Sequence, residues 1–179
     1  MPDPITPAPL VRALPRLRHA EIDALCDLLI DCVDSGASVS FMLPMTRAKA
    51  RAFWTGVAAS LERGERLLYV VEDAAGIVGT VQVVWAEPEN QPHRADVAKM
   101  LVHRRARRQG LGTALLRAAE QGARAQGRTL LVLDTMSGGD ADRLYAAQGW
   151  ERCGEIPNYA QWPAGGLGAT TIYFKSLPS

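Results

Sequence analysis

One segment, where an apolar strand leads into a helix, constrains this chain more than any other. It reads Lys99-Met-Leu-Val-His-Arg-Arg-Ala-Arg-Arg-Gln-Gly-Leu-Gly-Thr113, with four arginines and two glycines in the turn. A helix that begins near Leu111 presents unpaired backbone N–H groups and the positive end of its dipole to this turn. Gly110 and Gly112 allow a ligand to approach the backbone closely. The sequence therefore predicts an anion-binding site here.

Two common phosphate-binding loops do not fit this turn. A P-loop requires Gly-Lys-Ser/Thr, and the dinucleotide fingerprint requires a third glycine where Leu115 stands. A nucleic-acid surface is disfavoured, because no aromatic residues that could stack on bases are interleaved with Arg104, Arg105, Arg107 and Arg108. An arginine-rich surface turn, with glycines only for tightness, is the remaining structural alternative.

Composition indicates a globular protein without covalent staples. The chain has 179 residues, of which 47% are hydrophobic and 22% charged, enough for one core of ordinary size. Twenty basic and nineteen acidic residues give a net charge of +1, so no overall field attracts nucleic acid or anionic lipid. Three cysteines without CxxC spacing and three histidines argue against a disulfide framework or a metal site. We expect no metal, no nucleic-acid partner and no membrane partner.

The patterns predict a flexible proline-rich lead over residues 1–9 and one α/β domain over 10–179. The lead has no apolar core, so we expect neither a signal peptide nor a membrane anchor, and a cytoplasmic location. Helical spacing predicts helices over 18–33, over 46–64 with Thr46 as N-cap, over 111–127 and over 140–148. Alternating or continuous apolar runs predict strands over 10–14, 66–72, 77–85, 96–103, 129–134, 151–156 and 170–175.

The turn resembles the Arg/Gln-x-x-Gly-x-Gly signature of the GNAT acetyltransferases, here Arg107-Arg-Gln-Gly110-Leu-Gly112. The order of strand, turn, helix, strand and a late tyrosine is also similar to that family. The resemblance implies a mostly antiparallel, V-splayed mixed sheet of about seven strands flanked by about four helices. It also implies acetyl-CoA as co-substrate, with the pyrophosphate on backbone amides of the turn and the pantetheine arm paired with the strand. The implied CoA-binding residues are Met100, Leu101, Val102, Arg107, Arg108, Gln109, Gly110, Leu111, Gly112 and Thr113. Arg104 stands where the family often has proline, which affects the turn and not the amides.

A second segment, Asp140-Ala-Asp-Arg-Leu-Tyr145-Ala-Ala-Gln-Gly149-Trp150, resembles the family's short helix, whose tyrosine lies beside the thioester sulfur. The chemistry suits a phenol, because CoA leaves as a thiolate and a group with a pKa of about 10 can protonate it. The resemblance therefore implies Tyr145 as a catalytic acid. The alternative is a core tyrosine with a satisfied hydroxyl.

An ammonium acceptor must lose a proton before it attacks, so a carboxylate or a water chain is needed nearby. Asp134 ends an apolar run, where a carboxylate is costly to bury unless it has a partner or faces a cleft. The alternative for Asp134 is a cap over residues 135–139. Asp96 opens the strand that leads to the turn, and its alternative is a solvated charge.

Strand alternation predicts one face for Asp96, Ala98, Met100 and Val102, and the other face for Lys99.

Segments from Gly36 to the C-terminus are similar to the family's tabtoxin resistance acetyltransferases, which inactivate a β-lactam amino-acid toxin. The segments that carry this resemblance are Gly36–Met42, Arg94–Val102, Leu133–Thr135, Gly154–Tyr159 and Ile172–Lys175. The resemblance implies acid/base roles for Asp134 and for Asp96, which stands where those proteins have a carboxylate one methylene longer. It also implies that the acceptor is a small-molecule amine. We expect Phe41, Tyr159 and Trp162 to wall its pocket.

We therefore expect an N-acetyltransferase that acts by direct attack in a ternary complex, since no cysteine lies in either motif. Two alternatives remain open. One is an acetyltransferase for protein N-termini or lysines, which needs an open groove. The other is a non-catalytic acyl-CoA sensor. A homodimer is compatible with the sequence.

Overall fold

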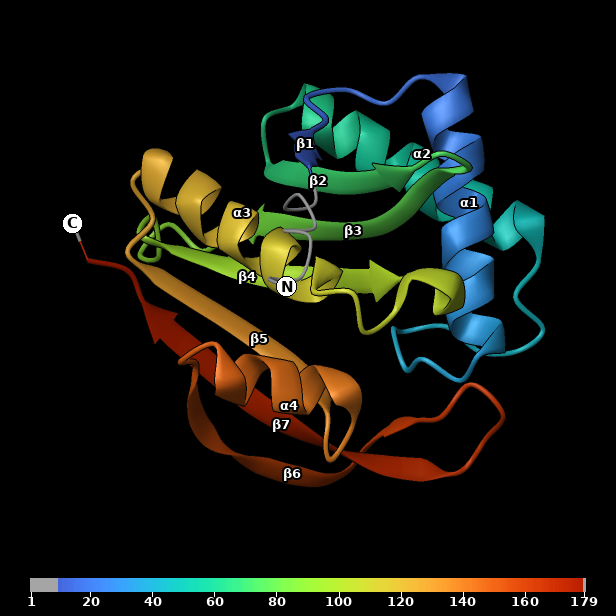
Figure 1. Ribbon diagram of the computed structural model, residues 1–179. Helices are drawn as coiled ribbons and strands as arrows, with labels where there is room; N and C mark the ends of the chain where they lie inside the picture. The colour runs from blue at the N-terminus through green and yellow to red at the C-terminus, as the bar shows by residue number, and fades with distance from the viewer. Residues whose placement is uncertain (1–9, 179) are drawn as a thin grey trace, which may run out of the picture.

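The computed structural model describes residues 10–178, so the predicted lead over residues 1–9 lies outside the described residues. The described chain forms four α-helices and seven strands in the predicted order (Figure 1). The helices are α1 (His19–Asp34), α2 (Arg47–Glu62), α3 (Leu111–Ala125) and α4 (Asp140–Ala147), with a 3-10 turn at Arg104–Ala106. The strands are β1 (Val11–Ala13), β2 (Arg66–Asp73), β3 (Gly76–Trp85), β4 (Arg94–Val102), β5 (Leu130–Met136), β6 (Glu151–Gln161) and β7 (Leu167–Ser176).

The seven strands form one mixed sheet in the order β1-β2-β3-β4-β5-β7-β6. Every neighbouring pair is antiparallel except β4 and β5. These two strands pair only from Arg94 with Leu130 to Asp96 with Val132, although both continue further. Figure 1 shows them separating beyond that point. The predicted V-splayed, mostly antiparallel sheet is confirmed, and its opening lies where β4 leads to the turn.

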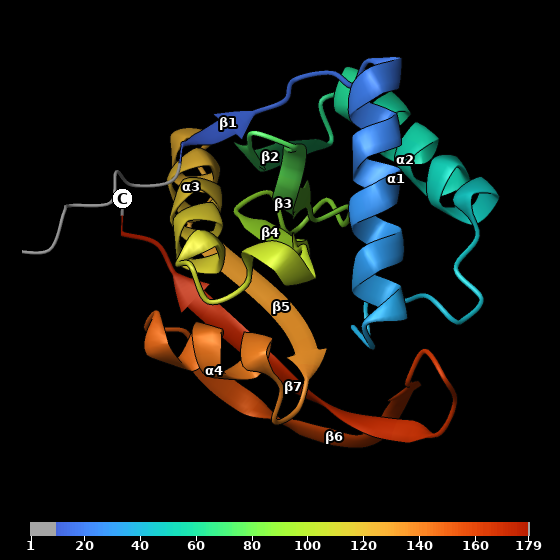
Figure 2. The same cartoon turned by 45° about the vertical axis from the view of Figure 1, so that its right-hand side comes forward.

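Helices cover both faces of the sheet (Figure 2). On one face α3 buries Leu115 and Leu116 against strands β2 to β5. On the other face α1 and α2 enclose a second apolar cluster that contains the fully buried Trp54. Each such buried side chain contributes about 1.5–3 kcal/mol relative to exposure. The packing of both helical layers therefore holds the central strands rigidly on either side of the opening.

The ends of the helices follow their sequence signals. The Thr46 side chain accepts the Lys49 N–H at 3.2 Å, which confirms the predicted N-cap of α2. The helix α1 ends before Gly36, which takes a left-handed φ of +89°. Strands β6 and β7 extend beyond the predictions, because they form one long hairpin that ends in a Gly165-Gly166 turn. Among residues 10–178, no helix has both the length and the apolarity to cross a membrane.

A β-bulge in β4 makes the predicted alternation wrong. Thr80 pairs with Leu101 but Gln82 pairs with Ala98, so Lys99 and Met100 both stand opposite one residue of β3. Lys99 accommodates the extra residue with a φ of +51°. Beyond the bulge the faces are exchanged: Leu101 packs in the α1–α2 cluster, while Met100 and Val102 pack against the α3 cluster. Asp96 and Ala98 therefore do not share a face with Met100 and Val102.

Candidate active site

A cleft of about 910 Å³ lies at the opening between β4 and β5. It is lined by the loop between α1 and α2, the end of β4, the turn before α3, the end of β5, the start of α4 and the β6–β7 hairpin. These elements converge on the same side of the molecule in Figures 1 and 2. The cleft therefore brings the two predicted motifs together.

The turn before α3 forms one end of the cleft. The first bond of the helix runs from the Ala114 N–H to the Gly110 carbonyl at 3.1 Å, so the amides of Leu111, Gly112 and Thr113 have no acceptor within the helix. Gly110 has a φ of +76°, a conformation that favours glycine. A Cβ on Gly112 would stand 3.0 Å from Leu144 of α4, so this glycine permits close helix packing. The free amides at a dipole end suit a phosphate group.

Three of the four arginines hold this turn in place through contacts with other segments of the protein. Arg104 pairs with Asp31, and Arg105 pairs with Asp73 at 3.1 Å and lowers the pKa of that carboxyl. Arg107 donates to Ser35 Oγ at 2.7 Å and to the Val102 carbonyl at 3.2 Å. Arg108 is exposed at the cleft. The arginine cluster thus mainly holds the loop in shape.

Most predicted CoA-binding residues line the cleft. Beyond Asp96, the edge of β4 that faces β5 has no strand partner, so Met100 to Val102 have one open edge for an extended ligand. Gln109 is the exception: its Nε2 donates to the Arg105 carbonyl at 3.3 Å, and it does not line the cleft. The residues that do line it are Met100, Leu101, Val102, Arg107, Arg108, Gly110, Leu111, Gly112 and Thr113.

Tyr145 of α4 reaches the cleft from within the core. Its ring packs 5.7 Å from that of Trp150 and 6.0 Å from that of Tyr173, which hold it in place. No hydrogen bond of its hydroxyl is formed within residues 10–178. Burial, and to a lesser degree the charge of Asp134, raise the pKa of Tyr145 well above its usual range. The phenol therefore keeps its proton at neutral pH.

Asp134 lies in the cleft on β5, exposed and not buried. Thr170 Oγ1 stands 3.5 Å from its carboxylate, at the limit of a hydrogen bond, and donates to the Thr135 carbonyl at 2.8 Å instead. The strand therefore does not hide this carboxylate, which is exposed in the cleft.

Asp96 occupies the last position at which β4 and β5 pair. It shares the α1–α2 side of the sheet with Asp134, because its neighbours Ala95 and Val97 pack on the α3 side. Its carboxylate pairs with Arg94, and it does not line the cleft. The structure therefore brings Asp134, and not Asp96, into the cleft lining.

The other end of the cleft is walled by the predicted aromatic residues. Phe41 lies in the α1–α2 loop and packs edge-on against Phe53 at 5.2 Å. Tyr159 and Trp162 extend from the β6–β7 hairpin. A hydrogen bond joins the α1–α2 loop to the β6–β7 hairpin: the Leu43 N–H donates to the Pro163 carbonyl at 2.9 Å. This end of the cleft is thus bridged by a backbone hydrogen bond.

The lining residues that escaped the sequence predictions include Lys99 and Cys32. The only signal for Lys99 was a lysine inside the strand that leads to the turn. Cys32 belongs to the apolar stripe of α1, and its Sγ lies 3.6 Å from the Val102 carbonyl. Burial raises the pKa of the Cys32 thiol to about 11, so the thiol is protonated at neutral pH.

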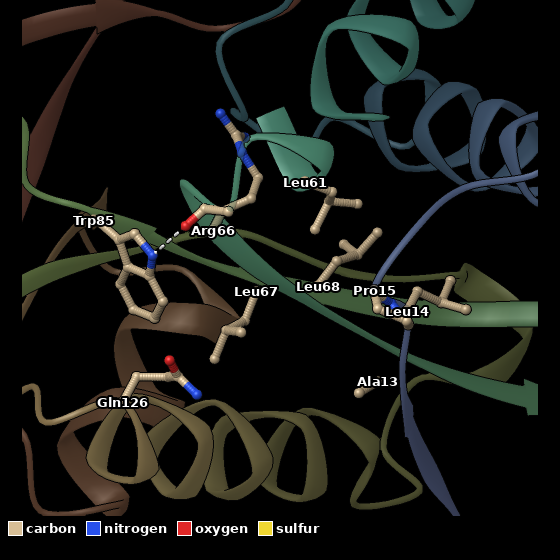
Figure 3. A pocket seen from close by; sticks show the side chains of 10 residues that line it. Ala13, Leu14, Pro15, Leu61, Arg66, Leu67, Leu68, Trp85 and Gln126 are labelled. Carbon is tan, nitrogen blue, oxygen red and sulfur yellow. Dashed lines mark hydrogen bonds between the residues drawn. The ribbon is translucent and has the colours of Figure 1, made fainter. Parts of the chain in front are cut away.

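A second hollow of about 270 Å³ lies between β1, β2 and the end of α3 (Figure 3). Two of its polar side chains are paired: Trp85 Nε1 donates to the Gly64 carbonyl at 2.8 Å, and Arg66 donates to Ser60 and Gln82. The lining of this hollow is mainly apolar.

Within the described residues, no group of three or more His, Cys, Asp or Glu side chains could hold a metal ion.

Known proteins resemble this chain in sequence and in fold. Residues 64–152 match the family model described as an acetyltransferase (GNAT) domain. An uncharacterized N-acetyltransferase from the hisH–hisA intergenic region of Azospirillum brasilense is 29% identical over 160 residues, which cover 87% of this chain and 94% of the relative.

Solved structures share the fold at low identity. Ribosomal-protein-alanine N-acetyltransferase from Brucella melitensis has a TM-score of 0.76 at 22% identity, over 94% of this chain and 99% of that chain. YncA from Salmonella typhimurium, solved with its cofactor acetyl-CoA, has a TM-score of 0.77 at 17% identity, over 96% and 95%. The family model and the relative show that residues 64–152 carry a GNAT acetyltransferase domain and that the protein is an N-acetyltransferase.

Proposed function

We propose that the protein transfers an acetyl group from acetyl-CoA to the amine of a small molecule. The observation that carries this proposal is a single cleft that joins the free amides of α3 to Tyr145 and Asp134. The amides of Leu111 to Thr113 would hold the pyrophosphate, and the open edge of β4 would pair with the pantetheine arm. In the reaction, the acceptor nitrogen bonds to the acetyl carbon, the carbon–sulfur bond breaks and the sulfur takes a proton.

Two residues of the cleft carry out the two proton transfers of the reaction. Asp134 accepts the proton that the ammonium acceptor must lose, directly or through water, and Tyr145 donates a proton to the departing sulfur. Asp96, on the same side of the sheet, is the second candidate for the base. Cys32 is unsuited to an acyl-enzyme because its thiol stays protonated at neutral pH. Attack is therefore direct, in a ternary complex.

A small acceptor is favoured by the bridge between Leu43 and Pro163. A peptide would need a groove open at both ends, whereas this hydrogen bond joins the two walls of the acceptor end. An amino-acid toxin such as tabtoxin is one acceptor of suitable size. A protein N-terminus is the second candidate acceptor, because a structure named as a ribosomal-protein-alanine N-acetyltransferase has the same fold over nearly the whole chain.

Release of free CoA thiol from acetyl-CoA tests the proposal. The panel contains amino acids, amino-acid antibiotics, aminoglycosides, polyamines and peptides, and calorimetry measures acetyl-CoA binding. We expect acetyl-CoA to bind and small amines to be acetylated faster than peptides. Faster acetylation of peptides would establish the second candidate, and no thiol release with any amine would refute transferase activity of the proposed kind.

The variant Tyr145→Phe tests the catalytic acid. We expect kcat to fall about a hundredfold, because the sulfur loses its proton donor, with the Kd of acetyl-CoA nearly unchanged. The ring packing is retained, so the melting temperature serves as the control for folding. An unchanged kcat would remove the acid role.

The variants Asp134→Asn and Asp96→Asn separate the two candidate bases. We expect Asp134→Asn to lower kcat at least tenfold near neutral pH and Asp96→Asn to lower it less, because only Asp134 lines the cleft. The pH profile of kcat/KM for each variant is the measurement. The reverse order of effects would assign the base to Asp96.

A further inference from the structure

Lys99 is a charged residue of the cleft to which the proposed chemistry gives no role. The bulge in β4, with its φ of +51°, sets this side chain apart from the regular alternation of the strand. Its Nζ donates to Ser40 Oγ at 3.0 Å and lies 5.9 Å from the centre of each of the Phe41 and Phe53 rings. Lys99 thus stands at the aromatic, acceptor end of the cleft.

This ammonium group has no carboxylate partner among the residues that the structure describes. Within residues 10–178 no acidic oxygen lies within 4.0 Å of Lys99 Nζ. By contrast, the half-buried Lys175 binds Glu120 at 2.8 Å. Burial lowers the pKa of Lys99, which means that the surroundings do not fully compensate its charge. An ammonium that is half-buried among aromatic rings, with one neutral hydroxyl as its partner, is suited to an anionic group of a ligand.

The same cleft contains the opposite charge. Asp134 lines it and is near enough to act on the pKa of Lys99, yet the two side chains form no ion pair. The cleft therefore presents a separated cation and anion. A ligand that carries an ammonium and a carboxylate a few bonds apart complements both, whereas a plain amine or a polyamine leaves Lys99 unpaired or repelled.

We propose that Lys99 binds the carboxylate of a zwitterionic, amino-acid-like acceptor and so determines the acceptor class. The acceptor's carboxylate pairs with Lys99 beside Ser40, and its amine lies toward Asp134 and Tyr145. The inference rests on the proposed N-acetylation of small amines. It adds the anionic group that the acceptor must carry and the residue that recognises it.

Matched acceptors provide the first test. Several L-amino acids are compared with their carboxamides and with the corresponding decarboxylated amines, by thiol release at saturating acetyl-CoA. We expect kcat/KM to be at least tenfold higher for the carboxylates. Equal values, within a factor of two, would overturn the role of Lys99 while leaving N-acetylation intact. Absence of release with every amine would instead refute the proposed function, and this inference with it.

Variants of Lys99 provide the second test. Lys99→Met keeps an unbranched side chain, one atom shorter, and removes the charge, so we expect the KM for carboxylate acceptors to rise at least tenfold. The KM for the amides, kcat and the Kd of acetyl-CoA should change less than threefold. Lys99→Arg should restore part of the preference, and Lys99→Glu should shift it toward diamines.

A matched control separates recognition from structure. Lys49→Met makes the same change at an exposed lysine of α2 that does not line the cleft, so its kinetics should match those of the parent protein. Melting temperatures of all variants check folding. An equal loss of kcat by Lys99→Met with carboxylates and amides would assign Lys99 to proton transfer or to structure, and the proposal would be wrong.

Discussion

At the scale of single residues, two glycines within helices have opposite surroundings, one packed against the sheet and one exposed. Gly122 of α3 faces β2, and a Cβ there would overlap the Tyr69 hydroxyl and stand 3.0 Å from Leu67. Gly56 of α2 is exposed, with nothing within 4 Å of such a Cβ. Helical spacing places Gly122 on the apolar stripe of α3 and Gly56 off that of α2. Only the distance between α3 and the sheet decides what a methyl group at Gly122 meets.

Alanine at each position tests this reading. We expect Gly122→Ala to lower the free energy of unfolding by about 1–3 kcal/mol through overpacking. Gly56→Ala should raise it by about 0.5–1 kcal/mol, because alanine is the better helix former. Urea unfolding measures both. Stabilisation by Gly122→Ala would show that Tyr69 moves aside at little cost.

At the scale of elements, the start of α3 is the part of the site with the strictest backbone requirement. Gly110 at its N-terminus and Gly127 beyond its C-terminus have φ values of +76° and +71°, and neither has a neighbour that a Cβ would meet. Alanine therefore imposes the same backbone strain at both ends, about 1–2 kcal/mol. Only the N-terminal end presents amides to the cleft.

The pair Gly110→Ala and Gly127→Ala separates strain from binding. We expect similar losses of stability from both, but a rise in the Kd of acetyl-CoA, about tenfold, only from Gly110→Ala, because the free amides of α3 would be displaced. Calorimetry and thermal unfolding give the two quantities. Equal acetyl-CoA affinities would mean that the turn does not hold the pyrophosphate.

At the scale of the whole molecule, burial of ionisable groups makes the free energy of unfolding vary with pH in the alkaline range. Burial raises the pKa of Cys32 to about 11 from an ordinary value of 9.0. The unfolded chain therefore loses this proton at a lower pH than the folded chain does. The stability that the raised pKa of Cys32 contributes is fully present below pH 9, and it declines as the pH rises toward 11.

We expect the free energy of unfolding to fall by up to about 2 kcal/mol over this range on account of Cys32. The variant Cys32→Ala should show a correspondingly shallower decline, whatever its stability at pH 8. Urea unfolding between pH 8 and 11 measures both slopes. Parallel slopes would show that Cys32 ionises equally in the folded and unfolded chains.

Much of the fold and part of the site could be predicted because their signals are local. The stripe of α1, the Thr46 cap and the glycine turn each depend on residues a few positions apart. The bulge at Lys99 could not be predicted, because it arises from the register between β3 and β4. One extra residue exchanged the faces of Met100 and Val102.

The sequence by itself determined the order of the elements, the glycine turn before α3 and the family resemblance, because hydrophobic periodicity and turn-forming residues are signals carried by residues close together in the chain. Only the tertiary structure decided that Asp134 lines the cleft while Asp96 pairs with Arg94, and that Lys99 donates to Ser40 beside the aromatic wall of the cleft. Burial and pairing of charge depend on segments far apart in the chain. The separation of β4 from β5 brings those segments together.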